Sequence, residues 1–358
     1  MRDTNIGKIR VGVVGYGRGW GLCNILKKFP EVELRAVCDS NPKIQDHVKK
    51  DHPEVSFYTD YYKMISSGNI DAVLIETPPA YHASYSIAAL EKNIHVLSDC
   101  PAVVSIKEGE QLWKVAQKSK AIYMFGENVN YWDFIKTCKE LKEKGLLGDP
   151  VYLEAEYIHD IRYLFSQTPW RETLPPILYI THSLGPIIEW IEEELIAVAC
   201  MDTGSHINKK RYQHDAMVAV FRTKSDIVVK ILCSFINNHP ACFHRYVYYG
   251  TKGYFERSSP LPDRVSSHLQ KTIFSTTQIR GMDGLMELPT SNIDLISEGH
   301  GGADYLMVKD FIKAIVKNLP SPIDVKKALK MSLPGVYALE SAKAGGKMIA
   351  IKYPWNEK

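Results

Sequence analysis

The chain has 358 residues, of which 45% are hydrophobic and 24% are charged, and this length is enough for two domains that each bury a core. The formal net charge of +3, without a dense run of Lys and Arg, argues against nucleic acid as a partner. Seven scattered cysteines without a C-x-x-C pair argue against a disulfide framework and a structural zinc site, and they fit a reducing, cytoplasmic setting without a bound metal.

The first third of the chain alternates short apolar runs with amphipathic segments. Strands are predicted at 9–15, 32–39, 71–77, 94–99 and 121–127, and helices at 22–29 and 84–93. Alternation at this spacing is typical of a doubly wound parallel sheet. We therefore predict an α/β domain over residues 1–127.

The pattern changes after residue 127. A helix is predicted at about 130–145, and longer, half-buried strands rich in Val and Tyr follow at 151–159, 216–223, 226–236 and 244–257. Residues 258–298, rich in Ser, Pro and Thr, are expected to form loops. Helices are predicted at 303–318 and near 325–345. Residues 128–358 are therefore expected to form an α+β domain with a broad, mainly antiparallel sheet.

A glycine-rich stretch, GYGRGWG, follows the first predicted strand and precedes a helix, as a dinucleotide-binding fingerprint requires. Gly15 and Gly17 supply the tight turn and the close approach of the backbone to a pyrophosphate. The third glycine of the fingerprint is displaced, because Trp20 stands at its position and Gly21 comes one residue later. Asp39 ends the second predicted strand, where a carboxylate is expected to bind ribose hydroxyls.

The cofactor predicted from this stretch is NAD(H) rather than NADP(H). The sequence Asp-Ser-Asn that begins at Asp39 offers no arginine for a 2′-phosphate. We predict that Arg18 and Trp20 of the glycine-rich loop also contact the cofactor. The alternative interpretation is a tight turn followed by an ordinary capping aspartate.

Residues 71–105 resemble the signature of the Gfo/Idh/MocA oxidoreductases, which has a Thr-Pro-x-x-His turn, a helix that ends before His-Val, and a Glu-Lys-Pro turn. Thr77, Pro78, His82 and His95 match this signature position by position, with a structural role as the alternative for both histidines. The resemblance covers essentially the whole chain and implies a Rossmann domain followed by a domain with a large open sheet. It also implies that the two turns border the nicotinamide. The further cofactor-binding candidates in these turns are Thr77, Pro78, His82, Asp99 and Pro101. Asn128, which follows the last predicted strand, is one more.

The second turn departs from the family pattern, since Cys100 stands where the family has a lysine that helps to shuttle the substrate hydroxyl proton. A thiol is shorter than a lysine side chain, has an ordinary pKa near ~8.5 and offers no ammonium group. We interpret Cys100 as a small apolar residue that fills the turn. The proton chemistry is then expected to come from other residues.

Four stretches concentrate Glu, Tyr, His and Arg at the expected ends of strands or in loops: 126–131, 155–160, 168–172 and 179–186. Tyr157 and His159 are two residues apart on a predicted strand, so they project from the same face. Tyr179 and His182 are three residues apart, so one helical turn would bring them together. A buried structural histidine in a turn is the alternative interpretation of His182.

The same stretches resemble the NAD-dependent α-N-acetylgalactosaminidase branch of this superfamily, which also lacks the lysine. The shared motifs are Glu-Asn-x-x-Tyr, Tyr-x-His-Asp, Tyr-Pro-Thr-His-x-Leu-Gly-Pro, with isoleucine in place of the first proline here, and Gly-His-Gly-Gly. The resemblance implies catalytic roles for five residues: Glu127, Tyr157, His159, Tyr179 and His182. Substrate-binding candidates are Trp170, Arg171 and, from the last motif, His300. The loops beyond residue 258 do not align, so the identity of the substrate does not transfer.

Three functions fit these residues. The first is an NAD(H)-dependent oxidoreductase that moves hydride at a ring hydroxyl carbon of a sugar or glycoside, with His182 and Tyr179 as the base. The second is a glycosidase that oxidises the ring, eliminates the aglycone, adds water and returns the hydride, with Tyr157, His159 and Glu127 in the later proton steps. The third is a non-catalytic regulator that binds NAD and a sugar.

The expected partner is a small carbohydrate. No apolar run reaches the length of a signal-peptide core or a membrane span, so neither is expected. A broad sheet with one face to cover predicts a homo-oligomer, a dimer or a tetramer.

Overall fold

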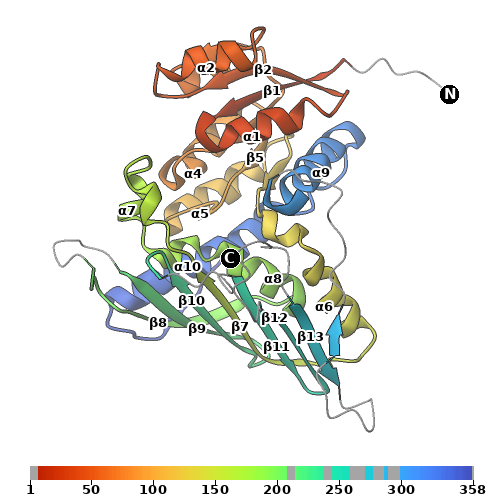
Figure 1. The fold of residues 1–358 in the computed structure, drawn as a ribbon, viewed down its shortest axis with the longest axis vertical. Coiled ribbons are helices and arrows are strands. Elements are labelled where there is room, and N and C mark those ends of the chain that lie inside the picture. Colours follow the sequence, from red (N-terminus) through yellow and green to blue (C-terminus); the bar gives the residue numbers. More distant parts are fainter. Residues whose placement is uncertain are drawn as a thin grey trace. The chain divides into compact units, whose positions relative to one another are not determined.

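Short runs of Val, Ile and Leu in the first third of the chain form a parallel sheet, as predicted. The computed structural model describes residues 7–207, 214–237, 244–258, 271–276, 286–288 and 299–356. In this part of the chain the first sheet has six strands, all parallel, in the order β3-β2-β1-β4-β5-β6. Figure 1 labels β1, β2 and β5 of this sheet. The strands are β1 (Ile9–Val14), β2 (Val32–Cys38), β3 (Ser56–Tyr58), β4 (Ala72–Ile75), β5 (His95–Ser98) and β6 (Tyr123–Phe125).

Helices connect the strands of this sheet, and their cover explains why the strands read as continuous apolar runs rather than alternating patterns. All four residues of β4 are buried. The connecting helices are α1 (Tyr16–Leu26), α2 (Ile44–Asp51), α3 (Tyr61–Ser66), α4 (Pro79–Glu91) and α5 (Ile106–Ala116). Side chains cap two of them: Asp60 accepts hydrogen bonds from backbone N–H groups at the start of α3, and Ser105 accepts one at the start of α5.

The strand order is that of a doubly wound dinucleotide-binding fold. Successive strands are added on one side of β1 up to β3 and on its other side from β4 onward, so the order reverses between β1 and β4. In such sheets ligands bind outside the carboxyl ends of the strands at this reversal. Gly15 follows β1, Glu76 follows β4, Asp99 follows β5 and Gly126 follows β6. This edge therefore carries most of the cofactor-binding candidates.

The second sheet has nine strands among the described residues, in the order β14-β13-β12-β11-β7-β10-β9-β8-β15. Its pairs are antiparallel except for β7 and β10, which run parallel, and the mainly antiparallel sheet is confirmed. The strands are β7 (Pro150–Ile158), β8 (Leu195–Asp202), β9 (Ala216–Thr223), β10 (Val228–Ser234), β11 (His244–Gly250), β12 (Gly253–Ser258), β13 (Lys271–Thr276), β14 (Met286–Leu288) and β15 (Ile349–Ala350).

The expectation of loops over 258–298 is wrong for two stretches, β13 and β14. β13 pairs with β12 and β14 pairs with β13, both antiparallel. The sequence of β13, KTIFST, contains the Ser and Thr that suggested loops, but β-branched Thr and Ile also favour strands. The other residues of this range lie outside the described part of the chain.

Helices α6 (Asp133–Glu143) and α8 (Thr181–Ile191) pack against each other, and α8 also packs on β7. The buried Trp190 of α8 donates its indole N–H to the carbonyl of Ile135 in α6, at 3.1 Å. The remaining helices are α7 (Trp170–Thr173), α9 (Ala303–Lys317) and α10 (Val325–Lys343). In α10, Ser341 accepts a hydrogen bond from the backbone N–H of Cys200 in β8.

By packing, the chain divides into two compact units. The first comprises Met1–Asn128 with Ile293–Leu329, and the second Val129–Asn292 with Lys330–Lys358. Helix α9 belongs to the first unit and packs on α1, where the rings of Phe29 and Tyr305 stack with centroids 5.2 Å apart. No helix in the described part of the chain has both the length and the apolar character needed to span a bilayer.

Candidate functional site

Gly15 and Gly17 serve different purposes in the turn between β1 and α1. Gly15 has φ +88°, and a Cβ there would lie 2.3 Å from the carbonyl oxygen of Glu76, so the fold itself requires glycine. A Cβ on Gly17 would meet nothing within 4 Å. The backbone at Gly17 is thus open toward a ligand, as the close approach of a pyrophosphate needs.

Gly19 is a residue that the sequence analysis missed. A Cβ on Gly19 would lie 2.7 Å from a methyl carbon of Val13, whereas a Cβ on Gly21 would meet nothing within 4 Å. Close packing of helix on strand is the purpose of the third fingerprint glycine. Gly19, one residue before the expected position, meets that need here.

Asp39 lies directly after β2, as predicted. Its carboxylate accepts hydrogen bonds from the backbone N–H of Tyr16 at 3.0 Å and from that of Asn41 at 2.9 Å. These bonds hold the carboxylate beside the start of α1. Contact with ribose hydroxyls stays a prediction.

Arg18 lies among three carboxylates from separate segments. Its Nε lies 3.0 Å from Glu76 Oε2 and 3.1 Å from Asp99 Oδ2, and its Nη2 lies 3.3 Å from Asp304 Oδ1. Burial, followed by the negative charge of Asp99, raises the pKa of Glu76 well above its usual value, and Arg18 opposes this only in part. Burial also acts to raise the pKa of Asp304, but the hydrogen bond from His300 and the charge of Arg18 outweigh it and lower that pKa.

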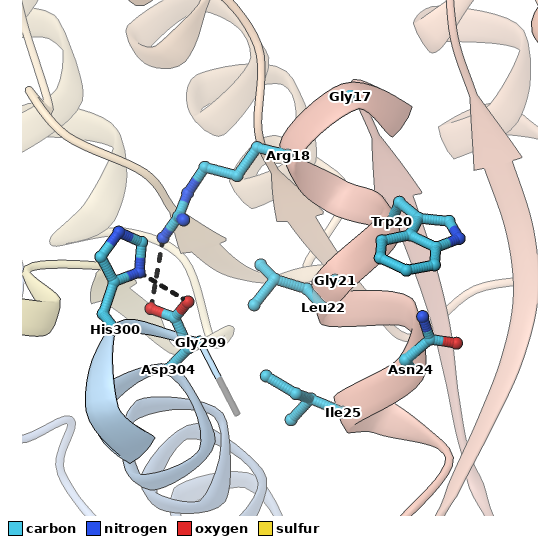
Figure 2. Close-up of a pocket in the computed structure, with 10 residues that line it drawn as sticks. All are labelled: Gly17, Arg18, Trp20, Gly21, Leu22, Asn24, Ile25, Gly299, His300 and Asp304. Carbon is cyan, nitrogen blue, oxygen red and sulfur yellow. Dashed lines mark hydrogen bonds and ion pairs between the residues drawn. The ribbon is translucent and has the colours of Figure 1, made fainter. Parts of the chain in front are cut away.

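A pocket of about 420 Å³ lies along α1 and the turn before α9 (Figure 2). Its wall carries Arg18, Asp304 and His300, whose side chains gather at one side in Figure 2. Trp20 projects from another side of α1 and donates its indole N–H to Asp51 at 2.9 Å. The pocket lies wholly within the first unit and includes Gly17.

His82 joins the two turns that were predicted to border the nicotinamide. One ring nitrogen lies 2.8 Å from the carbonyl oxygen of Pro101, and the other lies 2.6 Å from that of Thr77. The ring is buried and engaged on both sides, so it positions the two turns. Cys100 is also buried, and its thiol lies 3.6 Å from Asp99 Oδ1, which agrees with a small residue filling the turn.

The remaining cofactor candidates lie in the same unit. Pro78 is the N-cap residue of α4. Asn128 donates its side-chain amide to Asp304 Oδ1 at 2.9 Å. The hydroxyl of Thr77 is buried and has no hydrogen-bond partner among the described residues. With the open backbone at Gly17 and the acid after β2, this unsatisfied hydroxyl fits a bound dinucleotide.

Tyr157, Tyr179 and His182 form a ring cluster in the second unit. The ring centroids of Tyr179 and His182 lie 4.9 Å apart, which confirms their predicted proximity, and both lie 5.7 Å from the centroid of Tyr157. Tyr179 ends a 3₁₀ turn (Pro176–Tyr179), and His182 lies in the first turn of α8 rather than in a loop. The phenol oxygen of Tyr157 lies 3.1 Å from Nδ1 of His159.

The cluster includes two further rings that the sequence analysis missed, those of His244 and Phe235. His244 in β11 is the direct cross-strand partner of Tyr157 in β7, and their ring centroids lie 4.9 Å apart. Phe235 lies 5.9 Å from Tyr179 by ring centroids. The alternation of aromatic residues that begins at His244 could have indicated that these rings share one face of a strand. It could not have indicated that this strand, β11, pairs with β7.

The pKa of His159 lies below its usual value. Burial disfavours the imidazolium, and the positive charge of Arg171 adds to this, while Asp160 opposes it. His159 is therefore a neutral imidazole at neutral pH, and its Nδ1 lies within hydrogen-bond distance of the Tyr157 hydroxyl. Arg171 stacks on Trp170 with its guanidinium carbon 4.3 Å from the ring centroid, so the two substrate-binding candidates form one unit.

In an Arg171→Gln variant, we expect the pKa of His159 to rise, because a neighbouring cation is removed. Since the folded-state pKa of His159 is depressed, the group destabilises the fold as pH falls below its unfolded value of ~6.5, and the variant weakens that acid effect. Histidine NMR titration measures the pKa, with the exposed His47 as internal control. A His159 titration that is the same in the variant and the parent would contradict the assignment.

The two units divide the remaining candidates. Glu127 is fully buried and belongs to the first unit, whereas Tyr157, His159, Tyr179 and His182 belong to the second. His300, a substrate-binding candidate by its motif, lies in the first unit beside Arg18. The functional roles of these residues stay predictions.

Comparison with known proteins identifies the class of the first unit. Residues 9–127 match the Gfo/Idh/MocA model, described as an oxidoreductase family with an NAD-binding Rossmann fold. The description of this model agrees with the predicted resemblance, with a Rossmann fold for this stretch and with NAD as the cofactor.

Two curated relatives point to one branch. The chain is 24% identical over 377 residues to a glycosyl hydrolase family 109 protein from Saccharopolyspora erythraea, covering 94% of this chain and 81% of that protein. It is 29% identical over 202 residues to an α-N-acetylgalactosaminidase from Shewanella oneidensis. This second alignment covers 51% of the chain and only 44% of the Shewanella protein. Both relatives carry names of the branch that the motifs indicated.

Solved structures share the fold over nearly the whole chain. Myo-inositol 2-dehydrogenase from Lactobacillus plantarum has a TM-score of 0.78 at 19% identity, with 96% of this chain and all of that chain covered (100%). Scyllo-inositol dehydrogenase from Lactobacillus casei, crystallised with NAD(H) and scyllo-inositol, has a TM-score of 0.76 at 19% identity, covering 96% and 99%. At these identities the similarity shows the fold alone.

Proposed function

We propose that the protein uses NAD to oxidise a ring carbon of a glycoside reversibly and thereby cleaves the glycosidic bond. The observation that carries this proposal is the ring cluster of Tyr157, His159, Tyr179 and His182, with Asp-Cys-Pro in place of the family's Glu-Lys-Pro. A simple dehydrogenase needs one proton carrier, whereas oxidation, elimination and hydration need several. These four residues supply two phenols and two imidazoles.

The residues would divide the proton steps as follows. His182, beside Tyr179, removes the proton of the ring hydroxyl. NAD, when bound, supplies the acceptor for the hydride from that carbon. The neutral His159, beside the Tyr157 hydroxyl, removes the proton from the carbon next to the new ketone. The ketone makes the C–H bond of that carbon acidic. Glu127 serves in a later proton step, as the motif implies.

The cofactor would be held by the residues at the carboxyl edge of the parallel sheet. Gly15 and Gly17 form the turn for the pyrophosphate, and Asp39 binds the ribose. Thr77 supplies its unsatisfied hydroxyl, and His82 holds the turn of Thr77 against that of Pro101. The other candidates are Arg18, Trp20, Pro78, Asp99 and Asn128.

The second candidate function is an NAD-dependent sugar or inositol oxidoreductase that releases reduced cofactor. The similarity to two inositol dehydrogenases in fold favours it. Both functions begin with the same hydride transfer, so both use the same cofactor and the same hydroxyl base. The regulator that only binds NAD and sugar is the third.

Aryl glycosides, free sugars and inositols, offered to the NAD-loaded protein in D₂O, distinguish these functions. The glycosidase is expected to release aglycone without net reduced cofactor and to leave deuterium on the carbon next to the oxidised one. Stoichiometric reduced cofactor would instead identify the oxidoreductase. Release of aglycone without deuterium would contradict a route through a ketone, and bound NAD without either product would leave the regulator.

We further propose a small carbohydrate as the only class of substrate, a cytoplasmic location and a homo-oligomer, each from the sequence arguments above. The residues beyond 258 do not align with the glycosidase branch, so the glycoside panel is the experiment that identifies the sugar. Sedimentation of the purified protein tests the oligomer.

A further inference from the structure

The Gly-His-Gly-Gly motif forms a turn that the proposed chemistry does not use. Residues 299–302 all have positive φ, with values of 53°, 48°, 69° and 89°. Gly299 has a specific reason to be glycine, because a Cβ there would lie 2.4 Å from Asp304 Oδ2. The turn therefore brings its backbone against the first residues of α9.

Asp304 holds both His300 and Arg18. Its Oδ2 accepts a hydrogen bond from Nδ1 of His300 at 2.9 Å, and its Oδ1 accepts one from Arg18 at 3.3 Å (Figure 2). Oδ1 also accepts from Asn128 at 2.9 Å. The carboxylate is 5% exposed, so it is fixed among these donors, and its lowered pKa keeps it charged. The His300 side chain is 50% exposed and lines the pocket.

The wall that carries His300 and Arg18 encloses the same pocket as Gly17, the glycine whose backbone is open to a ligand. Nitrogen donors of Arg18 and His300 therefore lie in the pocket into which a pyrophosphate next to Gly17 extends. Diphosphate oxygens accept hydrogen bonds from a guanidinium and from Nε2–H of an imidazolium whose Nδ1–H is held by Asp304, and such charge-assisted bonds are stronger than neutral ones.

We infer that His300 binds the diphosphate of NAD rather than the sugar, and that Asp304 is a positioning residue that holds His300 and Arg18 toward it. This assignment rests on NAD as the cofactor and is independent of which reaction follows. It differs from the substrate-binding role that the motif implied for His300. The Gly-His-Gly-Gly turn thus becomes part of the cofactor site, although it lies far along the chain from the glycine-rich loop.

The test compares ligands with and without a diphosphate. Affinities for NAD, ADP and adenosine are measured by calorimetry for the parent protein and for His300→Ala, Asp304→Asn and, as a matched control, His47→Ala on the exposed face of α2. His300→Ala is expected to weaken NAD and ADP by a similar factor, about tenfold or more, and to leave adenosine unchanged. Asp304→Asn should lower the same two affinities selectively, and His47→Ala should change none.

Two results would overturn the inference. Equal weakening of adenosine and ADP would show that the substitutions damage the unit as a whole. Unchanged NAD and ADP affinity with a raised KM for a sugar substrate would return His300 to the substrate side. The binding measurements need no turnover, so failure of the glycosidase proposal leaves their outcome readable, and a melting curve of each variant checks that it folds.

Discussion

A His182→Gln variant is expected to bind NAD as the parent does and to turn over substrate about 10²–10⁴-fold more slowly, the usual contribution of a general base. His182 is 9% exposed as a residue, and its ring lies edge-on to Tyr179 with its centroid 5.7 Å from that of Tyr157. Glutamine keeps a polar side chain of similar length but is not a base at neutral pH. The measurement is the initial rate of aglycone release and of cofactor reduction at saturating NAD.

The fold is expected to survive this substitution. Tyr246 donates its hydroxyl to the backbone carbonyl of His182 at 2.7 Å, and that bond does not depend on the imidazole. A His47→Gln variant is the matched control, because His47 is exposed on α2 and belongs to neither site. Undiminished turnover in His182→Gln would remove His182 from the catalytic assignment and leave it a packing residue.

A Gly15→Ala variant is expected to lose about 3 kcal/mol of stability and, with it, NAD binding. Two costs combine: a positive φ at a residue with a side chain, and a Cβ placed 2.3 Å from the carbonyl oxygen of Glu76. That carbonyl belongs to the backbone after β4, so it has no rotamer by which to escape. Urea unfolding of Gly15→Ala and of the parent, followed by circular dichroism, measures the loss of stability.

Gly17→Ala is the matched partner of this experiment. A Cβ at Gly17 meets nothing within 4 Å and its φ is unstrained, so the unfolding midpoint should stay within about 0.5 kcal/mol of the parent. NAD affinity should fall nonetheless, because the methyl group lies where the pyrophosphate approaches. If Gly15→Ala unfolds like the parent, or Gly17→Ala binds NAD like the parent, the division between a fold glycine and a ligand glycine is wrong.

Much of the first unit was predictable because its strands are buried on both faces. A run such as β4, with four buried apolar residues, has a simple sequence pattern, and its carboxyl end marks the ligand edge. The acid after β2 followed from that rule, whereas the two turns after β4 and β5 came from the family resemblance. Glu76 obeyed the same rule but was overlooked, although it stands directly after β4.

The ring cluster was predictable only within each local segment. The spacing of Tyr179 and His182 predicted their contact, since one helical turn brings them together. His244 lies beside Tyr157 because β11 pairs with β7. The sequence of neither strand alone predicts which distant strand it pairs with or in which register. Likewise, the ion pair of Arg18 and Asp304 joins residues 286 positions apart.

The membership of α9 in the first unit has a consequence for synthesis. Residues 1–128 leave the ribosome well before Ile293–Leu329, the last part of the same unit. Until Asp304 emerges, Arg18 and Asn128 lack the carboxylate that they share in the finished protein, and Phe29 lacks the ring on which it stacks. Domains generally assemble as units during translation, so the nucleotide-binding half of this chain is completed only after nearly all of the other half has been made.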